Sequence, residues 1–169
     1  MFFKRIFLLA ATAISVSSLA HGQSADFCKA VTTIIKDAPH GFRNIKGRAD
    51  QSGHIWACGI KVPGTIASRF VENMGLYYEG GFFQTKNKDE VKGAYDKYRA
   101  MLKDCLSAHG YSLSQVDNFY PGLSPYKKLI FMAADESEPA AKPPAHITME
   151  VIYSKELGNY AIVMYIFEH

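Results

Sequence analysis

Long apolar runs, catalytic signatures and a strong charge bias are all missing from this sequence of 169 residues. It contains no G-x-S-x-G, no H-E-x-x-H, no P-loop and no dinucleotide fingerprint. It therefore does not indicate any of the enzyme or nucleotide-binding classes that carry these motifs. Lysine and arginine number 19 against 16 acidic residues, a formal net charge of +3. So small an excess predicts no general attraction to nucleic acid or to anionic lipid.

The most apolar stretch, IFLLAATAISV at residues 6–16, is shorter than the roughly 20 residues needed to span a bilayer. Two basic residues precede it and the small residues SSLAHGQSA follow it, which is the order of a secretory signal peptide. We expect a signal peptide over residues 1–22, cleaved after Ala20 or Gly22, and therefore a periplasmic or secreted protein. Cleavage also removes those two basic charges, and we expect no stable membrane insertion afterwards.

Residues 23–169 suffice for a single domain with one hydrophobic core. Apolar residues recur at helical spacing from Phe27 to Ala38 and from Val91 to Leu106, and Asn87 with Glu90 has the spacing of a helix-capping pair. The remaining patterns predict six strands. These are residues 42–47, 54–62, 74–85, 126–134, 146–154 and 159–167, with a bulge favoured over a turn at Gly80–Gly81.

This order predicts an α+β fold, an antiparallel sheet with two helices packed on one face. Two halves, each a helix followed by three strands, could join in this way, and an α+β sandwich without internal symmetry is the alternative. The polar, proline-rich segment at residues 134–145 predicts a mobile loop between two strands.

Three segments together resemble parts of small exported bacterial α+β proteins of unassigned function. They are FCKAVTTIIKDAPHGFRNIKG, VPG and AYDKYRAMLKDCLSAHGY, within the span from Phe27 to Tyr111. The resemblance implies this fold class and brings no activity with it.

The three cysteines, Cys28, Cys58 and Cys105, predict one disulfide and one thiol in an oxidising compartment. We expect Cys58–Cys105, because Cys58 shares a strand face with Trp56 and Cys105 lies on the apolar stripe of the covering helix. Cys28 is the alternative partner and could replace either one, and Cys28–Cys105 becomes possible if the two helices lie antiparallel.

Cys105 and His109 are the only pair with spacing suited to catalysis, because four residues on a helix place them one turn apart. They could pair a thiolate with a base or hold a metal ion. We favour a structural interpretation, with Cys105 in a disulfide and His109 near the negative end of the helix dipole. The other histidines are scattered, so we expect no metal site and no cofactor.

Two surface features remain. Lys36, Arg43, Lys46 and Arg48 surround the first helix-to-strand corner and predict a possible anion patch. The second is a possible aromatic surface on the strand expected at residues 74–85, formed by Tyr77, Tyr78, Phe82 and Phe83. Because side chains alternate along a strand, half of these rings would face outward. The acidic residues Glu72, Glu79 and Glu150 are dispersed and predict no carboxylate pair.

The sequence therefore favours a non-enzymatic binding or interaction module for an unknown protein or small molecule of the cell envelope, with no nucleic-acid partner. One alternative is an enzyme of unrecognised type that uses Cys105 and His109. Another is an envelope inhibitor or immunity-type protein.

Overall fold

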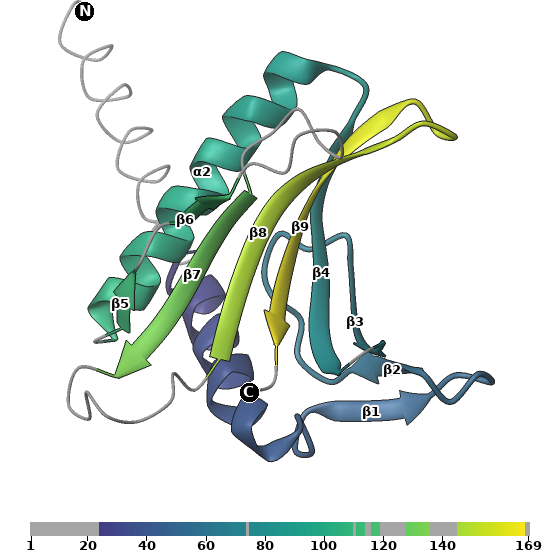
Figure 1. Cartoon of the computed structure of the whole chain (residues 1–169), viewed down its shortest axis with the longest axis vertical. Coiled ribbons are helices and arrows are strands. Elements are labelled where there is room, and N and C mark those ends of the chain that lie inside the picture. Colours follow the sequence, from purple (N-terminus) through teal and green to yellow (C-terminus); the bar gives the residue numbers. More distant parts are fainter. Residues whose placement is uncertain are drawn as a thin grey trace, which may run out of the picture.

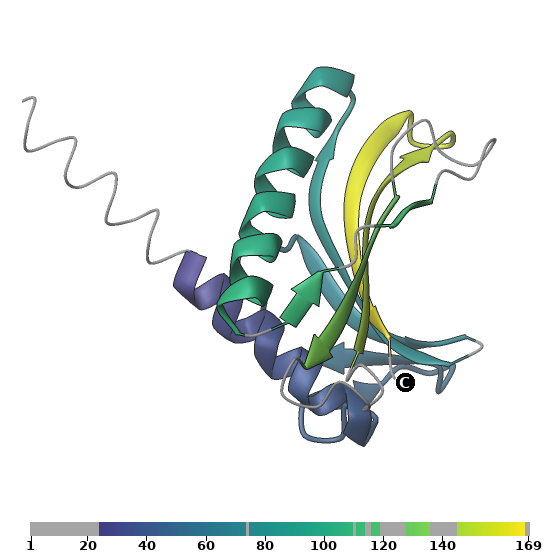
Figure 2. The ribbon, with the colours of Figure 1, turned by 60° about the vertical axis from the view of Figure 1, so that its left-hand side comes forward.

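The computed structural model describes residues 24–73, 75–109, 111–113, 116–118, 128–135 and 145–167. The expected signal peptide lies outside these residues, as does the greater part of the expected loop, of which only the two ends fall in strands. Within the described residues, two α-helices lie on the same side of a bent antiparallel sheet (Figures 1 and 2). The predicted fold class is confirmed.

The nine strands form one sheet in the order β1-β2-β3-β4-β9-β8-β7-β5, and β6 also pairs with β7. Their bounds are β1 Lys46–Ala49, β2 Ile55–Cys58, β3 Ala67–Glu72, β4 Leu76–Thr85, β5 Tyr111–Leu113, β6 Val116–Asn118, β7 Lys128–Asp135, β8 Ala145–Ser154 and β9 Asn159–Phe167. The six expected strands are all present, and β3, β5 and β6 are additional. Because β5 and β6 pair with opposite ends of β7, they share one position at the sheet edge.

The sheet joins two helix-and-strand halves through their last strands. The first half is the helix of residues 24–37 with β1 to β4, and the second is α2 (Lys88–Ala108) with β5 to β9. β4 and β9 pair antiparallel in the middle of the sheet. Each half therefore contains more strands than the three expected, in the same overall order.

Local sequence explains where α2 begins. The Asn87 side chain accepts hydrogen bonds from the backbone N–H groups of Asp89 and Glu90, as the capping spacing predicts. The Glu90 carboxylate accepts from Thr85 Oγ1 at 2.7 Å, and Thr85 Oγ1 accepts from the Asn87 N–H at 3.1 Å. The buried stripe of α2 then packs with the first helix and the sheet in one core.

The first corner is tighter than the sequence predicted. A 3₁₀ turn (η1, Ala38–His40) follows the first helix, and Gly41 and Phe42 both have positive φ, 64° and 53°. Phe42 is fully buried against Phe70, with ring centroids 4.9 Å apart. The chain therefore turns through residues 41–45, and the strand expected at residues 42–47 begins at Lys46 instead.

The glycine pair lies inside one long strand. β4 runs without interruption through Gly80 and Gly81, and its register against β9 shifts between Gly81 and Phe83. The single strand expected through this pair is confirmed, but both glycines stay in regular register and the bulge lies one residue later, at Phe82. Residues before it alternate between the helix-covered face and the opposite face.

Candidate functional site

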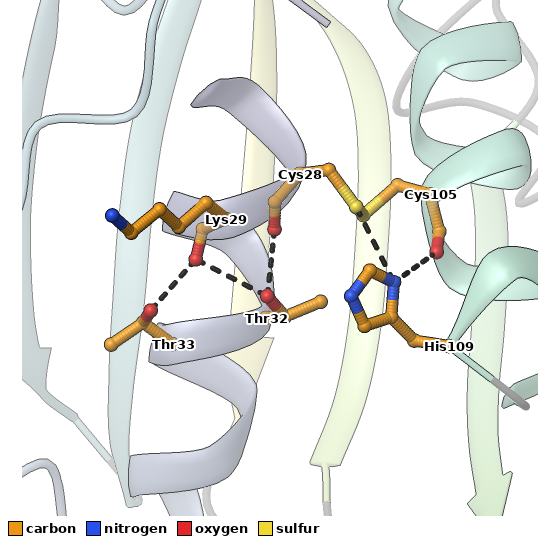
Figure 3. The surroundings of a disulfide bond; sticks show 6 residues. All are labelled: Cys28, Lys29, Thr32, Thr33, Cys105 and His109. Carbon is orange, nitrogen blue, oxygen red and sulfur yellow. Dashed lines mark hydrogen bonds between the residues drawn. A yellow bond between two sulfur atoms is a disulfide. The ribbon is translucent and has the colours of Figure 1, made fainter. Parts of the chain in front are cut away.

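The disulfide joins Cys28 to Cys105, so the expected Cys58–Cys105 bond is wrong and the alternative partner is the true one. Cys28 lies near the start of the first helix and Cys105 near the end of α2, with their Cα atoms 5.2 Å apart (Figure 3). Figure 2 shows that the two helices meet at these ends and then diverge, so the bond forms without the antiparallel pairing that we expected it to need. The bond ties two helices that are 77 residues apart in sequence, a constraint of about 4 kcal/mol in the chain-entropy model.

His109 lies against this disulfide. Its Nδ1 is 3.5 Å from Cys28 Sγ and 3.0 Å from the backbone oxygen of Cys105 (Figure 3). Cys105 is almost fully buried, whereas His109 is exposed. With Cys105 bonded to Cys28, it has no thiolate to offer as a nucleophile in this state.

Cys58 is the free thiol, half-buried on β2. Its Sγ donates to the carbonyl oxygen of Ile60 at 3.0 Å, and burial raises the pKa of the thiol. A raised pKa leaves little thiolate at neutral pH, so Cys58 lacks the environment of a reactive cysteine.

The four basic residues of the expected anion patch come from three elements. Lys36 is on the first helix, Arg43 is in the turn, and Lys46 and Arg48 are in β1. Lys46 Nζ lies 4.5 Å from the centre of the Trp56 ring, so this cation already has an aromatic partner.

The expected aromatic surface is divided by the fold. Tyr78 and Phe82 are buried in the core, and Phe83 packs against it. Tyr77 alone of the four belongs to the other face, because it pairs with Phe167 while Tyr78 pairs with the buried Ile166. The aromatic surface that does form uses residues from three strands.

We call that surface the open face, since neither helix lies on it (Figure 2). Its rings form a chain of contacts: Tyr77 to Tyr165 at 5.8 Å, Tyr77 to Phe167 at 5.3 Å, and His146 to Phe167 at 5.8 Å between centroids. The open face includes Arg69 of β3, Tyr77 and Glu79 of β4, His146 and Glu150 of β8, and Tyr165 and Phe167 of β9. Thr148 and Val163 lie among them by register and are buried.

Two carboxylates flank the middle of the open face. Glu79 pairs with Tyr165 across β4 and β9, and Glu150 comes from β8 on the other side. Burial raises the pKa of Tyr165 far above its ordinary value, and the negative charges of Glu150 and then Glu79 raise it further. Arg69, which is half-exposed, forms an ion pair with Glu79 at 2.7 Å. Glu150 is not part of that ion pair. The charges of the two carboxylates both oppose ionisation of Tyr165.

No family model, curated protein or solved structure matches the chain. Among the described residues, no helix has the length and apolar character required to cross a membrane. The chemistry of the open face and of the disulfide corner is therefore the basis for assigning a function.

Most of the open face was missed in the sequence. Tyr165, Phe167 and His146 lie in strands whose alternate residues are buried, and nothing local marks them as a surface group. Glu79 and Glu150 are 71 positions apart in sequence, and only the pairing of β4, β9 and β8 brings them to one face. Period-two alternation along each strand was the one available signal, and it does not predict which strands become neighbours.

Proposed function

We propose that this protein is an exported, non-enzymatic binding module that holds a positively charged segment of a partner protein on the open face. The signal-peptide pattern at residues 1–22 supports export, and the Cys28–Cys105 disulfide is compatible with an oxidising compartment. The partner would then be met in the periplasm or outside the cell.

The observation that carries the proposal is the position of two carboxylates, Glu79 and Glu150, on either side of the aromatic centre of the open face. The charges of Glu150 and Glu79, which oppose ionisation of Tyr165, favour a cation at the same place. The rings of Tyr77 and Tyr165 are only partly buried, and such rings attract lysine and arginine side chains by about 0.5–1 kcal/mol each at exposed sites. Aromatic and acidic groups on one face thus suit a basic, partly apolar segment.

An extended polypeptide suits this face better than a compact small molecule. The rings and carboxylates are spread over strands β3, β4, β9 and β8, four adjacent positions of the sheet. Neighbouring strands lie about 4.8 Å apart, so the group spans roughly 14 Å. Several side chains of one segment can contact such a surface at once.

The test is an NMR titration of the mature protein with a peptide of alternating arginine and glycine. We expect shifts in the amides of β4, β8 and β9, and an affinity several-fold lower in Glu150→Gln. Asp96→Asn is the matched control, because it also removes one carboxylate, but from the exposed ion pair with Lys92 on α2.

Equal weakening by the two variants would show a general charge effect and contradict the proposal. So would equal binding of a peptide with glutamate in place of arginine. A small polyamine that binds as tightly as the peptide would reject the polypeptide class of partner.

A further inference from the structure

The disulfide corner brings together three atoms that can bind a metal. Cys28 Sγ, Cys105 Sγ and a ring nitrogen of His109 lie within 4.8 Å of one another. Cys105 and His109 are one helical turn apart at the end of α2, and the first helix brings Cys28 to the same point (Figure 3). Two thiolates and an imidazole are ligands that zinc prefers.

The corner is open to solvent. It borders a hollow of about 500 Å³ between the two helices, and His109 is exposed at its rim. Lys29 and Asp104 also line the hollow, so its charged groups include both signs. A small reductant and a hydrated ion therefore have a path to the sulfur atoms, which a buried disulfide would deny them.

We propose that reduction of the Cys28–Cys105 disulfide creates a Zn²⁺ site of two thiolates and His109, with a water molecule as the fourth ligand. A dithiol reductant supplies two electrons and becomes a disulfide itself. The Cys28–Cys105 S–S bond breaks, and two protons give two thiols. Zn²⁺ then displaces both thiol protons to solvent and binds neutral His109 through Nδ1. A small-molecule disulfide reverses the step: it accepts two electrons from the two thiolates and leaves as two thiols after taking two protons from solvent, while the Cys28–Cys105 S–S bond forms again and Zn²⁺ is released.

The geometry requires little movement. Tetrahedral zinc with Zn–S of about 2.3 Å and Zn–N of about 2.0–2.1 Å places sulfur and nitrogen about 3.5 Å apart. Cys28 Sγ and His109 Nδ1 are already 3.5 Å apart. The two sulfurs, which are bonded to each other in the disulfide, must separate to about 3.8 Å in the zinc site. Nδ1 must also leave the Cys105 carbonyl oxygen, which the exposed ring can do by rotation about its side-chain bonds.

The site is independent of the open face, which lies on the other side of the sheet (Figure 2). Failure of one proposal therefore leaves the other standing. The site also differs from an enzyme that uses Cys105 and His109 as nucleophile and base, because here both thiolates are held by the ion.

The experiment titrates the mature protein with Co²⁺ and Zn²⁺, with and without prior reduction by a phosphine that does not bind metal. We expect one ion per reduced chain, thiolate-to-cobalt charge-transfer bands with tetrahedral ligand-field intensity, and none of these in the oxidised protein. Cys28→Ser and His109→Ala should each weaken Zn²⁺ binding by about 100-fold or more, since even residues that only orient ligands cost 10–100-fold. Cys58→Ser is the matched control and should leave binding unchanged, because Cys58 lies on β2 and its sulfur donates to the carbonyl oxygen of Ile60, away from the disulfide corner.

A reduced protein that takes up no ion would overturn the site, as would weak octahedral bands or undiminished binding in Cys28→Ser. Circular dichroism follows the fold throughout. If reduction unfolds the chain, Zn²⁺ must restore the native spectrum in wild type and fail to do so in His109→Ala. Failure of Zn²⁺ to refold the reduced wild type would reject the proposal.

Discussion

The two faces of strands β8 and β9 are made from alternate residues of the same short segments, and they differ sharply in chemistry. On the helix-covered face, Met149 and Met164 pair across the strands and are completely buried. On the open face, Glu150 and Tyr165 remain partly exposed among rings and carboxylates. One-residue steps along the chain therefore separate core from candidate binding surface.

This difference indicates what each face is for. The covered face requires only apolar side chains of the right volume. The open face holds carboxylates close to a partly buried phenol, an arrangement that opposes tyrosine ionisation. Stability alone does not call for such a surface, which is consistent with a role in binding.

The largest expected effect is on the covered face. Met149→Ala should lower the free energy of unfolding by about 2–5 kcal/mol, because it leaves a cavity under α2 and the first helix. Glu150→Gln, one residue further and on the opposite face, should change it by no more than about 0.5 kcal/mol. Urea unfolding followed by circular dichroism measures both values. Comparable losses in the two variants would show that the open face also supports the fold.

The adjacent glycines of β4 provide a second comparison of the faces. A Cβ at Gly80 would lie 2.6 Å from the hydroxyl oxygen of the fully buried Tyr78, whereas a Cβ at Gly81 would meet only the Ala67 carbonyl oxygen, at 3.9 Å. Gly80→Ala should therefore cost about 1–3 kcal/mol through overpacking. Gly81→Ala should stay within about 0.5 kcal/mol of wild type in the same unfolding assay. A neutral Gly80→Ala would mean that Tyr78 has room to move.

The parts of this fold that were predictable are those specified locally. The α2 cap depends on Asn87 and the next three residues. The bulge that follows Gly80 and Gly81 depends on residues within the single strand β4. β3 was missed because Phe70 is its one fully buried residue, which leaves too weak an alternation to identify a strand. Local patterns thus identified the long elements and failed on the short strands β3, β5 and β6.

The non-local features were harder to predict for a physical reason. The sequence allowed either Cys28 or Cys58 as the disulfide partner of Cys105. The choice depends on how the two helices meet in space. The open face likewise depends on strand order, since β4 and β9 are neighbours despite α2 and four strands between them in sequence. Sequence spacing contains neither helix direction nor strand order.

The smallest expected effect is on tyrosine ionisation. It distinguishes Tyr165 on the open face from Tyr78 on the helix-covered face without unfolding the protein. Burial raises the pKa of both Tyr165 and Tyr78, but carboxylates contribute only at Tyr165, where Glu150 is the larger of the two. Each folded phenol stays neutral above the ordinary tyrosine pKa of about 10, at which unfolded tyrosine ionises. The stabilisation from the raised pKa of the folded phenols is therefore complete below about pH 10, and it is lost as the pH rises through the folded pKa.

Glu150→Gln should lower the pKa of Tyr165 and leave that of Tyr78 unchanged, as measured by NMR of tyrosine labelled with ¹³C at Cζ. An unchanged pKa of Tyr165 in Glu150→Gln would show that the Glu150 charge does not act on this ring. The reason to expect a cationic partner on the open face would then be lost.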